Sequence, residues 1–107
     1  MKVAVLSSCK LNIDGSFWLR TMSVEEAKAL AARAEKVVSF IEDRVTAVNI
    51  SILLEKDIKI SRSQYLHPIN QVALILKTDE PLPEGIVLSL EELQAKGAKF
   101  QVLIRLP

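Results

Sequence analysis

Short hydrophobic runs separated by polar turns divide the chain into segments of strand and helix length. Runs rich in β-branched residues predict strands. They cover residues 2–7, 36–41, 58–65, 71–78 and 100–106, and we interpret residues 16–21 as a further short extended piece. The run at 71–78 contains five consecutive apolar residues, which predicts a central strand covered on both faces.

Two segments carry the capping-box spacing that opens a helix. Ser23 with Glu26 begins a helix predicted over residues 24–36, whose apolar positions fall on one stripe. Ser89 with Glu92 begins a shorter helix that ends near Gly97.

A third helix, predicted over residues 42–55, is apolar around most of its circumference. Only four residues in its body and end are polar, namely Thr46, Asn49, Ser51 and Glu55. Such a helix must be covered on more than one side, and one sheet covers only one. The pattern therefore favours a homodimer, with burial under other elements of the same chain as the alternative.

The order of these elements predicts an α/β fold. We expect a single domain over residues 1–107, with a mixed β-sheet of about five strands and three or more packed helices.

Composition narrows the classes of partner. Lys and Arg number 14 against 13 acidic residues, a net charge of +1, so a dense cationic face for duplex DNA is not expected. One cysteine and one histidine exclude an intrachain disulfide and make a structural metal site or other cofactor unexpected. No apolar run is long enough to span a bilayer or to act as a secretory signal, so the expected setting is cytoplasmic.

The polar loop after the first strand is the first candidate site. Ser7, Ser8, Cys9 and Lys10 follow the carboxyl end of that strand, where ligands collect in α/β sheets. Hydroxyls, backbone amides and a lysine could hold a phosphate there. Cys9 could also be a nucleophile beside Lys10. The alternative is an ordinary polar loop with a small residue in it.

Further candidates lie in and after the strand predicted at 58–65. Ile58 and Ile60 are expected to face inward, and strict alternation would turn Arg62 inward too. Since an unpaired buried guanidinium is costly, either the strand ends there or Arg62 points at an anion. His67 could be a general acid or a loop residue. Glu42 and Asp43 could do acid–base chemistry or cap the helix that follows.

Several strings resemble one known family. Residues 82–93, LPEGIVLSLEEL, are similar to the signature R-L-x-E-G-x-V-L-S-x-E-E-L of the B116-like family, which includes viral type III anti-CRISPR ring nucleases and bacterial relatives. Similar strings occur at 6–11, 23–30, 39–47 and 60–62. The resemblance covers most of the chain.

The resemblance implies a mixed α/β homodimer that binds cyclic tetra-adenylate across its two-fold axis. Family members cleave this ring without a metal, by attack of a ribose 2′-hydroxyl assisted by a histidine and an arginine. On this resemblance the ligand-binding residues would be Ser7, Ser8, Cys9, Lys10, Arg44, Thr46, Arg62 and Glu84.

Two departures affect the cleaving residues. Asp43 stands at the family's histidine position, after Glu42 in place of a glycine, and Pro81 stands at an arginine position. An ordinary Asp is ionised at neutral pH, so it cannot donate a proton and would repel the phosphate. Losing a general acid costs roughly 10²–10⁴ in rate, and losing a cationic donor costs on the order of 10²–10³.

The leading hypothesis is therefore a non-cleaving binder of a cyclic oligoadenylate, acting as a sponge or sensor in type III CRISPR signalling. One alternative is a metal-independent ring nuclease in which His67 or Arg44 has taken over the missing roles. The other is a structural or protein-binding module that has kept only the fold.

Overall fold

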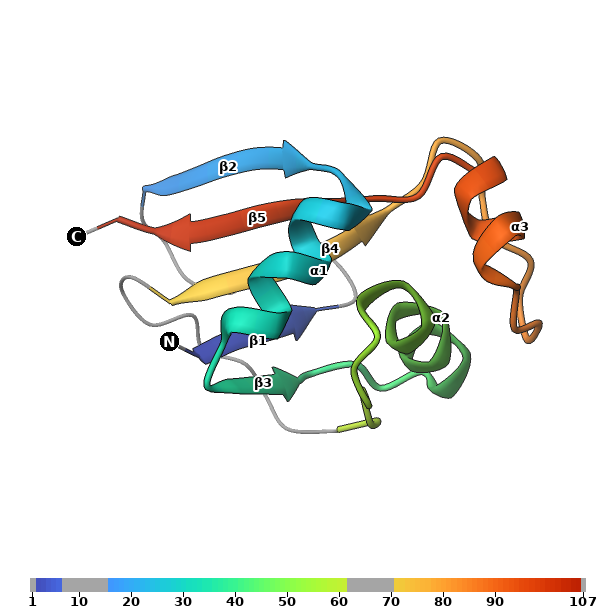
Figure 1. Cartoon of the computed structure of the whole chain (residues 1–107), viewed down its shortest axis with the longest axis horizontal. Helices are drawn as coiled ribbons and strands as arrows, with labels where there is room; N and C mark the ends of the chain where they lie inside the picture. The colour runs from blue at the N-terminus through green and yellow to red at the C-terminus, as the bar shows by residue number, and fades with distance from the viewer. Residues whose placement is uncertain (1, 7–15, 62–70, 107) are drawn as a thin grey trace.

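The computed structural model describes residues 2–6, 16–61 and 71–106, and Figure 1 shows how their elements are arranged. The elements are, in order, β1 (Lys2–Leu6), β2 (Phe17–Met22), α1 (Val24–Arg33), β3 (Lys36–Ser39), α2 (Arg44–Leu54), β4 (Val72–Lys77), α3 (Leu90–Ala95) and β5 (Lys99–Arg105).

The strands form one mixed sheet in the order β2-β5-β4-β1-β3. β1 is parallel to both β3 and β4, whereas β5 is antiparallel to β4 and β2. β4 is the middle strand, and Ala73, Leu74 and Ile75 within it are buried. The predicted α/β class, the five-stranded mixed sheet and the central position of 71–78 are thus confirmed.

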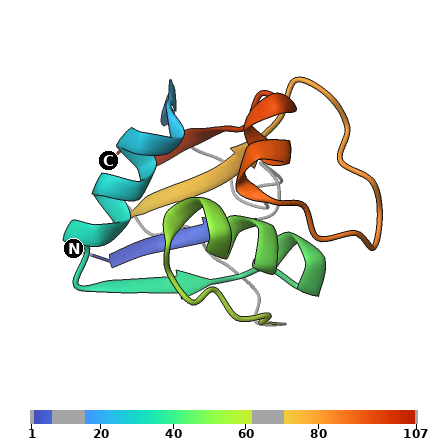
Figure 2. The same cartoon turned by 45° about the vertical axis from the view of Figure 1, so that its right-hand side comes forward.

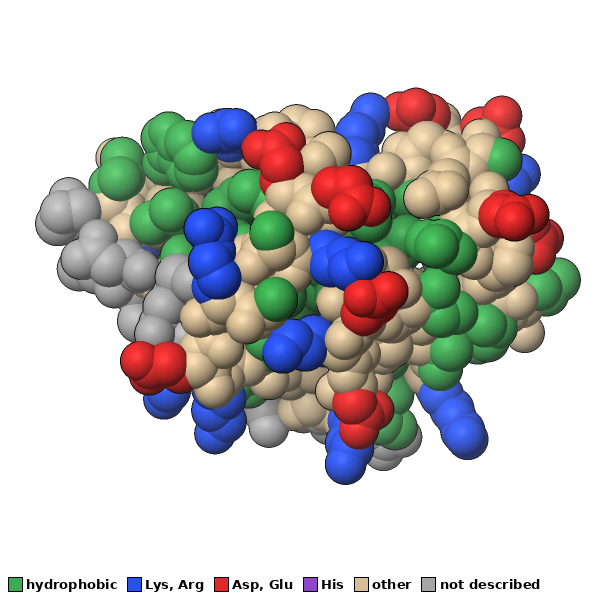
Figure 3. All heavy atoms as spheres, viewed as in Figure 1, with side chains coloured by type: hydrophobic (Ala, Val, Ile, Leu, Met, Phe, Trp, Pro, Cys, Tyr) green, Lys and Arg blue, Asp and Glu red, His purple; other side chains and the backbone are tan. Residues whose placement is uncertain are grey.

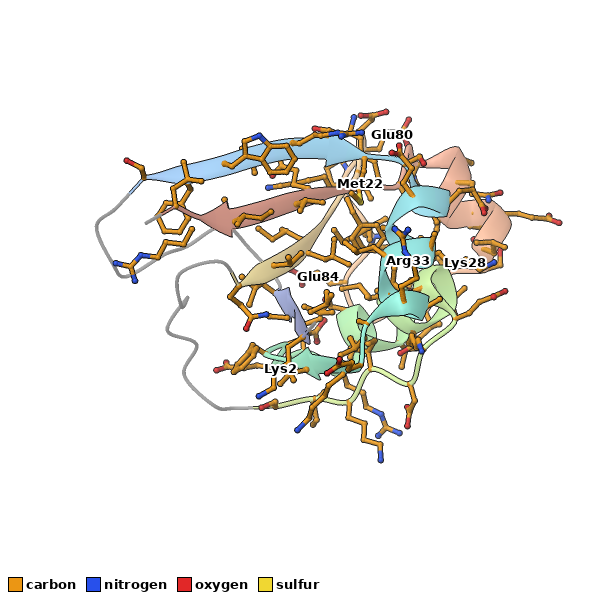
Figure 4. The ribbon with its side chains drawn as sticks, turned by 60° about the vertical axis from the view of Figure 1, so that its left-hand side comes forward. Lys2, Met22, Lys28, Arg33, Glu80 and Glu84 are labelled. Atoms are coloured by element: carbon orange, nitrogen blue, oxygen red, sulfur yellow. The ribbon has the colours of Figure 1, made fainter. Side chains whose placement is uncertain are left out.

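Side chains alternate between the two faces of the sheet, as strand geometry requires. Val5, Leu74 and Phe100 belong to the larger core, on the face that α1, α2 and α3 cover (Figure 2). A smaller cluster on the opposite face consists of Ala4, Leu6, Ala73, Ile75 and Leu103. Met22, the last residue of β2, packs against the larger core (Figure 4). Lys2, the first residue of β1, lies beside β3.

The helix starts were predictable because capping residues specify them. Ser23 and Ser89 each accept a hydrogen bond from the backbone N–H of Glu26 and Glu92, at 3.1 Å in both cases, and both capping boxes are complete. α1 ends at Arg33 rather than at residue 36, because β3 already begins at Lys36.

The strand predicted at 58–65 is wrong over residues 58–61, which join no sheet. Instead, the Ser51 hydroxyl oxygen on α2 accepts from the Ile58 N–H at 2.9 Å, and the Ser61 N–H donates to the Ile41 carbonyl at 2.8 Å. Ile58 is 6% exposed, but Ile60 is 48% exposed and does not face inward as predicted. Residues 62–65 lie outside the described residues. The outer strand next to β5 is β2.

α2 is covered partly by its own chain. Asn49 is only 2% exposed, and its side-chain oxygen accepts from the Leu88 N–H at 3.1 Å, which fixes the segment before α3 against the helix. Ser51 holds the segment at 57–60 on another side. Part of the coverage that the sequence assigned to a second subunit therefore comes from these two segments. Val45 and Val48 on α2 are only partly buried.

Candidate functional site

Asp43 caps the N-terminus of α2. Asp43 has an extended backbone, and its carboxylate accepts from the Thr46 N–H at 3.0 Å and from the Thr46 hydroxyl at 2.6 Å. The hydrogen bonds from the Thr46 hydroxyl and backbone lower the pKa of Asp43 below its ordinary value of 3.8. Asp43 is therefore an ionised helix cap at neutral pH.

The same contacts limit what Thr46 can offer a ligand. Its hydroxyl hydrogen is directed at Asp43, so a phosphate, which needs donors, finds none at this hydroxyl while the pair is intact. Arg44, the next residue after the cap, is exposed. Within the described parts of the chain its guanidinium has no hydrogen bond or ion pair, so it is available to an anion.

An open pocket of about 500 Å³ lies beside this helix start. One wall comes from the first half of α2 and the other from the segment at 57–60 that Ser51 holds in place. The lining residues are Arg44, Ala47, Val48, Asp57, Ile58, Lys59 and Ile60. We call this space the α2 pocket.

The α2 pocket is lined by both apolar and charged side chains. Val48, Ile58 and Ile60 supply hydrophobic surface, while Arg44 and Lys59 supply cations. Lys59 lies 3.7 Å from Asp57, but both side chains are about four-fifths exposed, so this ion pair is weak and easily exchanged. A flat apolar group with an attached anion, such as a nucleotide, has the chemistry to fit such a pocket.

The loop between β4 and α3 carries Pro81 and Glu84, which the sequence also singled out. Glu84 is exposed and forms a turn with Gly85, whose φ is +71°. Pro81 lies earlier in the loop and has no side-chain cation or donor. Two lysines pair with acidic residues at the start of this loop, because Lys96 contacts Glu80 at 3.1 Å and Lys99 contacts Asp79 at 2.6 Å.

The structure brings together only part of the predicted site. Arg44, Thr46 and Asp43 meet at the start of α2, and the loop of Glu84 reaches α2 through the bond between Leu88 and Asn49. No hydrogen bond or ion pair links Glu84 to α2 in the described residues. The remaining predictions lie outside the described residues, namely Ser7, Ser8, Cys9, Lys10, Arg62 and His67.

Asp57 and Lys59 were not predicted as site residues. The pattern at 58–65 resembles a strand, and nothing in it indicates that the segment packs on a helix. Asn49 and Ser51 did carry a signal, because polar residues in an almost wholly apolar helix need partners. Their partners are the two segments that flank α2.

Two classes of feature are absent from the described residues. No group of three or more His, Cys, Asp or Glu side chains there could hold a metal ion. In the same part of the chain, no helix is both long and apolar enough to cross a membrane.

The fold and site define a small α/β domain with a mixed five-stranded sheet, helices on one face and an open pocket at the start of α2. The STIV B116-like family model matches residues 3–102, and the chain belongs to this family. Among solved structures, B116 of Sulfolobus turreted icosahedral virus has the same fold. It matches with a TM-score of 0.76 and 16% identity, over 98% of this chain and 100% of that one. No curated protein matches the sequence.

Proposed function

We propose that this protein binds a cyclic oligoadenylate, first of all cyclic tetra-adenylate, between two copies of the chain and does not cleave it. Its role would be that of a sponge or sensor in type III CRISPR signalling. The proposal combines membership of the B116-like family with the state of one residue, Asp43.

The proposal that the protein does not cleave the ring rests on Asp43. At the family's histidine position the protein has an ionised carboxylate held by two hydrogen bonds from Thr46. A carboxylate with a lowered pKa has no proton for a leaving oxygen at neutral pH, and its charge opposes the approach of a phosphate. Pro81 adds nothing that could replace the family's arginine.

The α2 pocket supports binding of a nucleotide. Arg44 and Lys59 are cations on opposite walls, so a phosphate at the mouth could contact both. The apolar lining suits an adenine face. In a cyclic ligand with several phosphates, equivalent pockets of two subunits could take equivalent nucleotides.

A surface that could take the second copy lies on the segment that Asn49 holds against α2. Ile86, Val87 and Leu90 are 54%, 48% and 43% exposed, and the bond from Leu88 to Asn49 places this segment beside α2. Figure 3 shows hydrophobic side chains gathered at this end of the molecule. Exposed apolar groups in such a cluster are typical of protein interfaces.

Calorimetric titration with cyclic tetra-adenylate tests the proposal. We expect a dissociation constant below ~10 μM, and weakening on the order of tenfold when Arg44 or Lys59 becomes Ala, as for loss of a charge-assisted contact. Arg33→Ala is the matched control, since this exposed α1 cation does not line the pocket. Absence of binding, or equal weakening by all three substitutions, would contradict the proposal.

The competing enzyme hypothesis is tested on the same samples. A nuclease with relocated residues would convert the ring to linear products, and the Arg44→Ala or His67→Ala variant would stop it. We expect the ring to be recovered intact from the wild-type protein after prolonged incubation.

A further inference from the structure

Asp57 brings a negative charge to a pocket that is otherwise apolar or cationic. Among the described residues that line the α2 pocket, it alone is acidic. Its carboxylate lies 3.7 Å from the Lys59 ammonium. Arg44, the other cation of the lining, has no acidic partner among the described residues. With two cations and one anion, the described lining carries a net charge of +1.

The contact between Asp57 and Lys59 competes with a ligand for the same cation. Both side chains are exposed, and an ion pair of this kind contributes little to the stability of a fold. Its effect on binding is more direct, because both charged groups line the space that a ligand would enter. A phosphate that contacts Lys59 must either displace the Asp57 carboxylate or remain close to it.

Phosphate groups differ in the charge that this carboxylate opposes. A phosphodiester, as between the nucleotides of a ring, carries one negative charge. A terminal phosphomonoester has a second pKa of about 6 and carries about −1.5 to −2 at neutral pH. Coulomb energy is proportional to each of the two charges. A carboxylate in the lining therefore repels a monoester nearly twice as strongly as a diester at the same place.

We propose that Asp57 determines the ligand specificity of the α2 pocket, by selecting the single charge of a phosphodiester against the double charge of a terminal phosphate. The inference rests on the proposed function, in which Arg44 and Lys59 contact a phosphate of the ligand. It adds the class of ligand that the pocket prefers. A ring contains diester phosphates only, so it is preferred over linear oligoadenylates that end in a phosphate.

An alternative role for Asp57 makes the opposite prediction. A carboxylate accepts hydrogen bonds, and both the amino group of adenine and the ribose 2′-hydroxyl can donate them. If Asp57 accepted such a bond, loss of its charge would weaken binding instead of strengthening it. The contact with Lys59 favours the selective role, because it already directs the carboxylate toward the cation.

Two probes that differ by one charge test the proposal. Adenosine 5′-monophosphate and its methyl ester share base and sugar, and NMR titration gives their dissociation constants for wild type and for Asp57→Asn. This substitution keeps the size of the side chain and removes its charge. We expect roughly 2-fold tighter binding of the methyl ester and roughly 4-fold tighter binding of the monophosphate, within the range for exposed charge pairs. Equal gains, unchanged or weaker binding, or no binding of either probe would overturn the proposal.

Glu55→Gln is the matched control for the loss of one negative charge. Glu55 lies two residues before Asp57 and contacts Lys28 of α1 at 3.0 Å, so the substitution also releases one lysine (Figure 4). Neither Glu55 nor Lys28 is among the residues that line the α2 pocket. We expect unchanged affinities for both probes. Gains equal to those of Asp57→Asn would mean that only the net charge of the protein matters, and would contradict a selective role of Asp57.

Titration with cyclic tetra-adenylate separates this inference from the proposed function. If the ring binds to the wild-type protein but Asp57→Asn does not change the ratio of the two probe affinities, the specificity role is wrong and the proposed function stands. If the ratio changes as expected but the ring does not bind, the proposed function is wrong, and Asp57 still selects among phosphates at this pocket.

Discussion

Asp43 specifies where α2 begins. The first turn of α2 needs an acceptor for its free N–H groups, and an aspartate meets this need as the N-cap, with the Thr46 N–H at 3.0 Å. Asp43 therefore contributes to the helix whether or not this position takes part in any chemistry. Because capping residues act through local geometry, the sequence could predict this role for Asp43 and also the starts of α1 and α3.

Replacing Asp43 by Asn gives a prediction about pH. The folded-state pKa of Asp43 lies below its ordinary value of 3.8, so the ionised carboxylate stabilises the fold above that value, and this contribution is lost as the pH falls through the folded-state pKa. Asn can still cap the helix but does not titrate. We expect the stability difference between wild type and variant to shrink as the pH falls from about 6 toward 2. Chemical denaturation at several pH values measures it, and a constant difference would contradict the assignment.

Gly97 supplies a second prediction at this scale. It follows α3 with φ of +76°, and a Cβ there would collide with the Asp79 carboxyl group, which contacts Lys99 at 2.6 Å. Gly97→Ala should lower the free energy of unfolding by at least about 1–2 kcal/mol, the cost of a left-handed conformation with a side chain. Gly85→Ala is the control: its φ of +71° is similar, but its Cβ would meet nothing within 4 Å, so it should cost less. Equal losses of stability in the two variants would show that the collision with Asp79 does not contribute.

α2 was predictable from the sequence, whereas the segment at 58–61 that packs on it was not. Its periodicity and cap predict its limits to within two residues at either end. The pattern of residues 58–61, however, is the same for a strand in a sheet and for an extended segment on a helix. The difference arises from Ser51 and Ile41, which provide the partners of this segment from elsewhere in the chain. Such tertiary contacts leave no local signal in the segment itself.

A matched pair of serine substitutions tests the part that this segment plays in the site. Ser51→Ala removes the hydroxyl that bonds to Ile58, whereas Ser23→Ala removes the cap of α1, away from the α2 pocket. Each should cost about 1 kcal/mol of stability. Only Ser51→Ala should also weaken nucleotide binding, because it loosens one wall of the pocket. Equal affinities in the two variants would show that the wall does not contribute.

For the whole molecule, fold and site were predictable to different degrees. The order of the predicted elements indicated the mixed sheet, and the continuous apolar run at 71–78 indicated its central strand, in which Ala73, Leu74 and Ile75 are buried. The α2 pocket was not predictable, because Arg44 and Lys59 are 15 positions apart in sequence and meet only when the segment at 57–60 packs on α2. The position of β2 at the edge of the sheet likewise depends on strand order, which no local pattern gives.

A double variant tests whether cleavage of the ring depends on two positions, as we propose. In Asp43→His with Pro81→Arg, both family side chains are restored in a domain of the same fold. We expect measurable cleavage of cyclic tetra-adenylate, on the order of 10² or more above the wild-type protein. Each single variant should give less, and Asp43→Asn is the control that caps without donating a proton. A cleavage rate equal to that of the wild-type protein would mean that cleavage needs more than these two side chains.

The most direct test of the central claim is one incubation followed by two readouts. Purified protein is mixed with cyclic tetra-adenylate, the complex is separated from free ligand, and the bound nucleotide is released by denaturation and identified by mass. The account predicts that the ring is retained by the protein, with a dissociation constant below ~10 μM, and that it is released intact. A ring that does not remain with the protein, or one recovered as linear fragments, would contradict it.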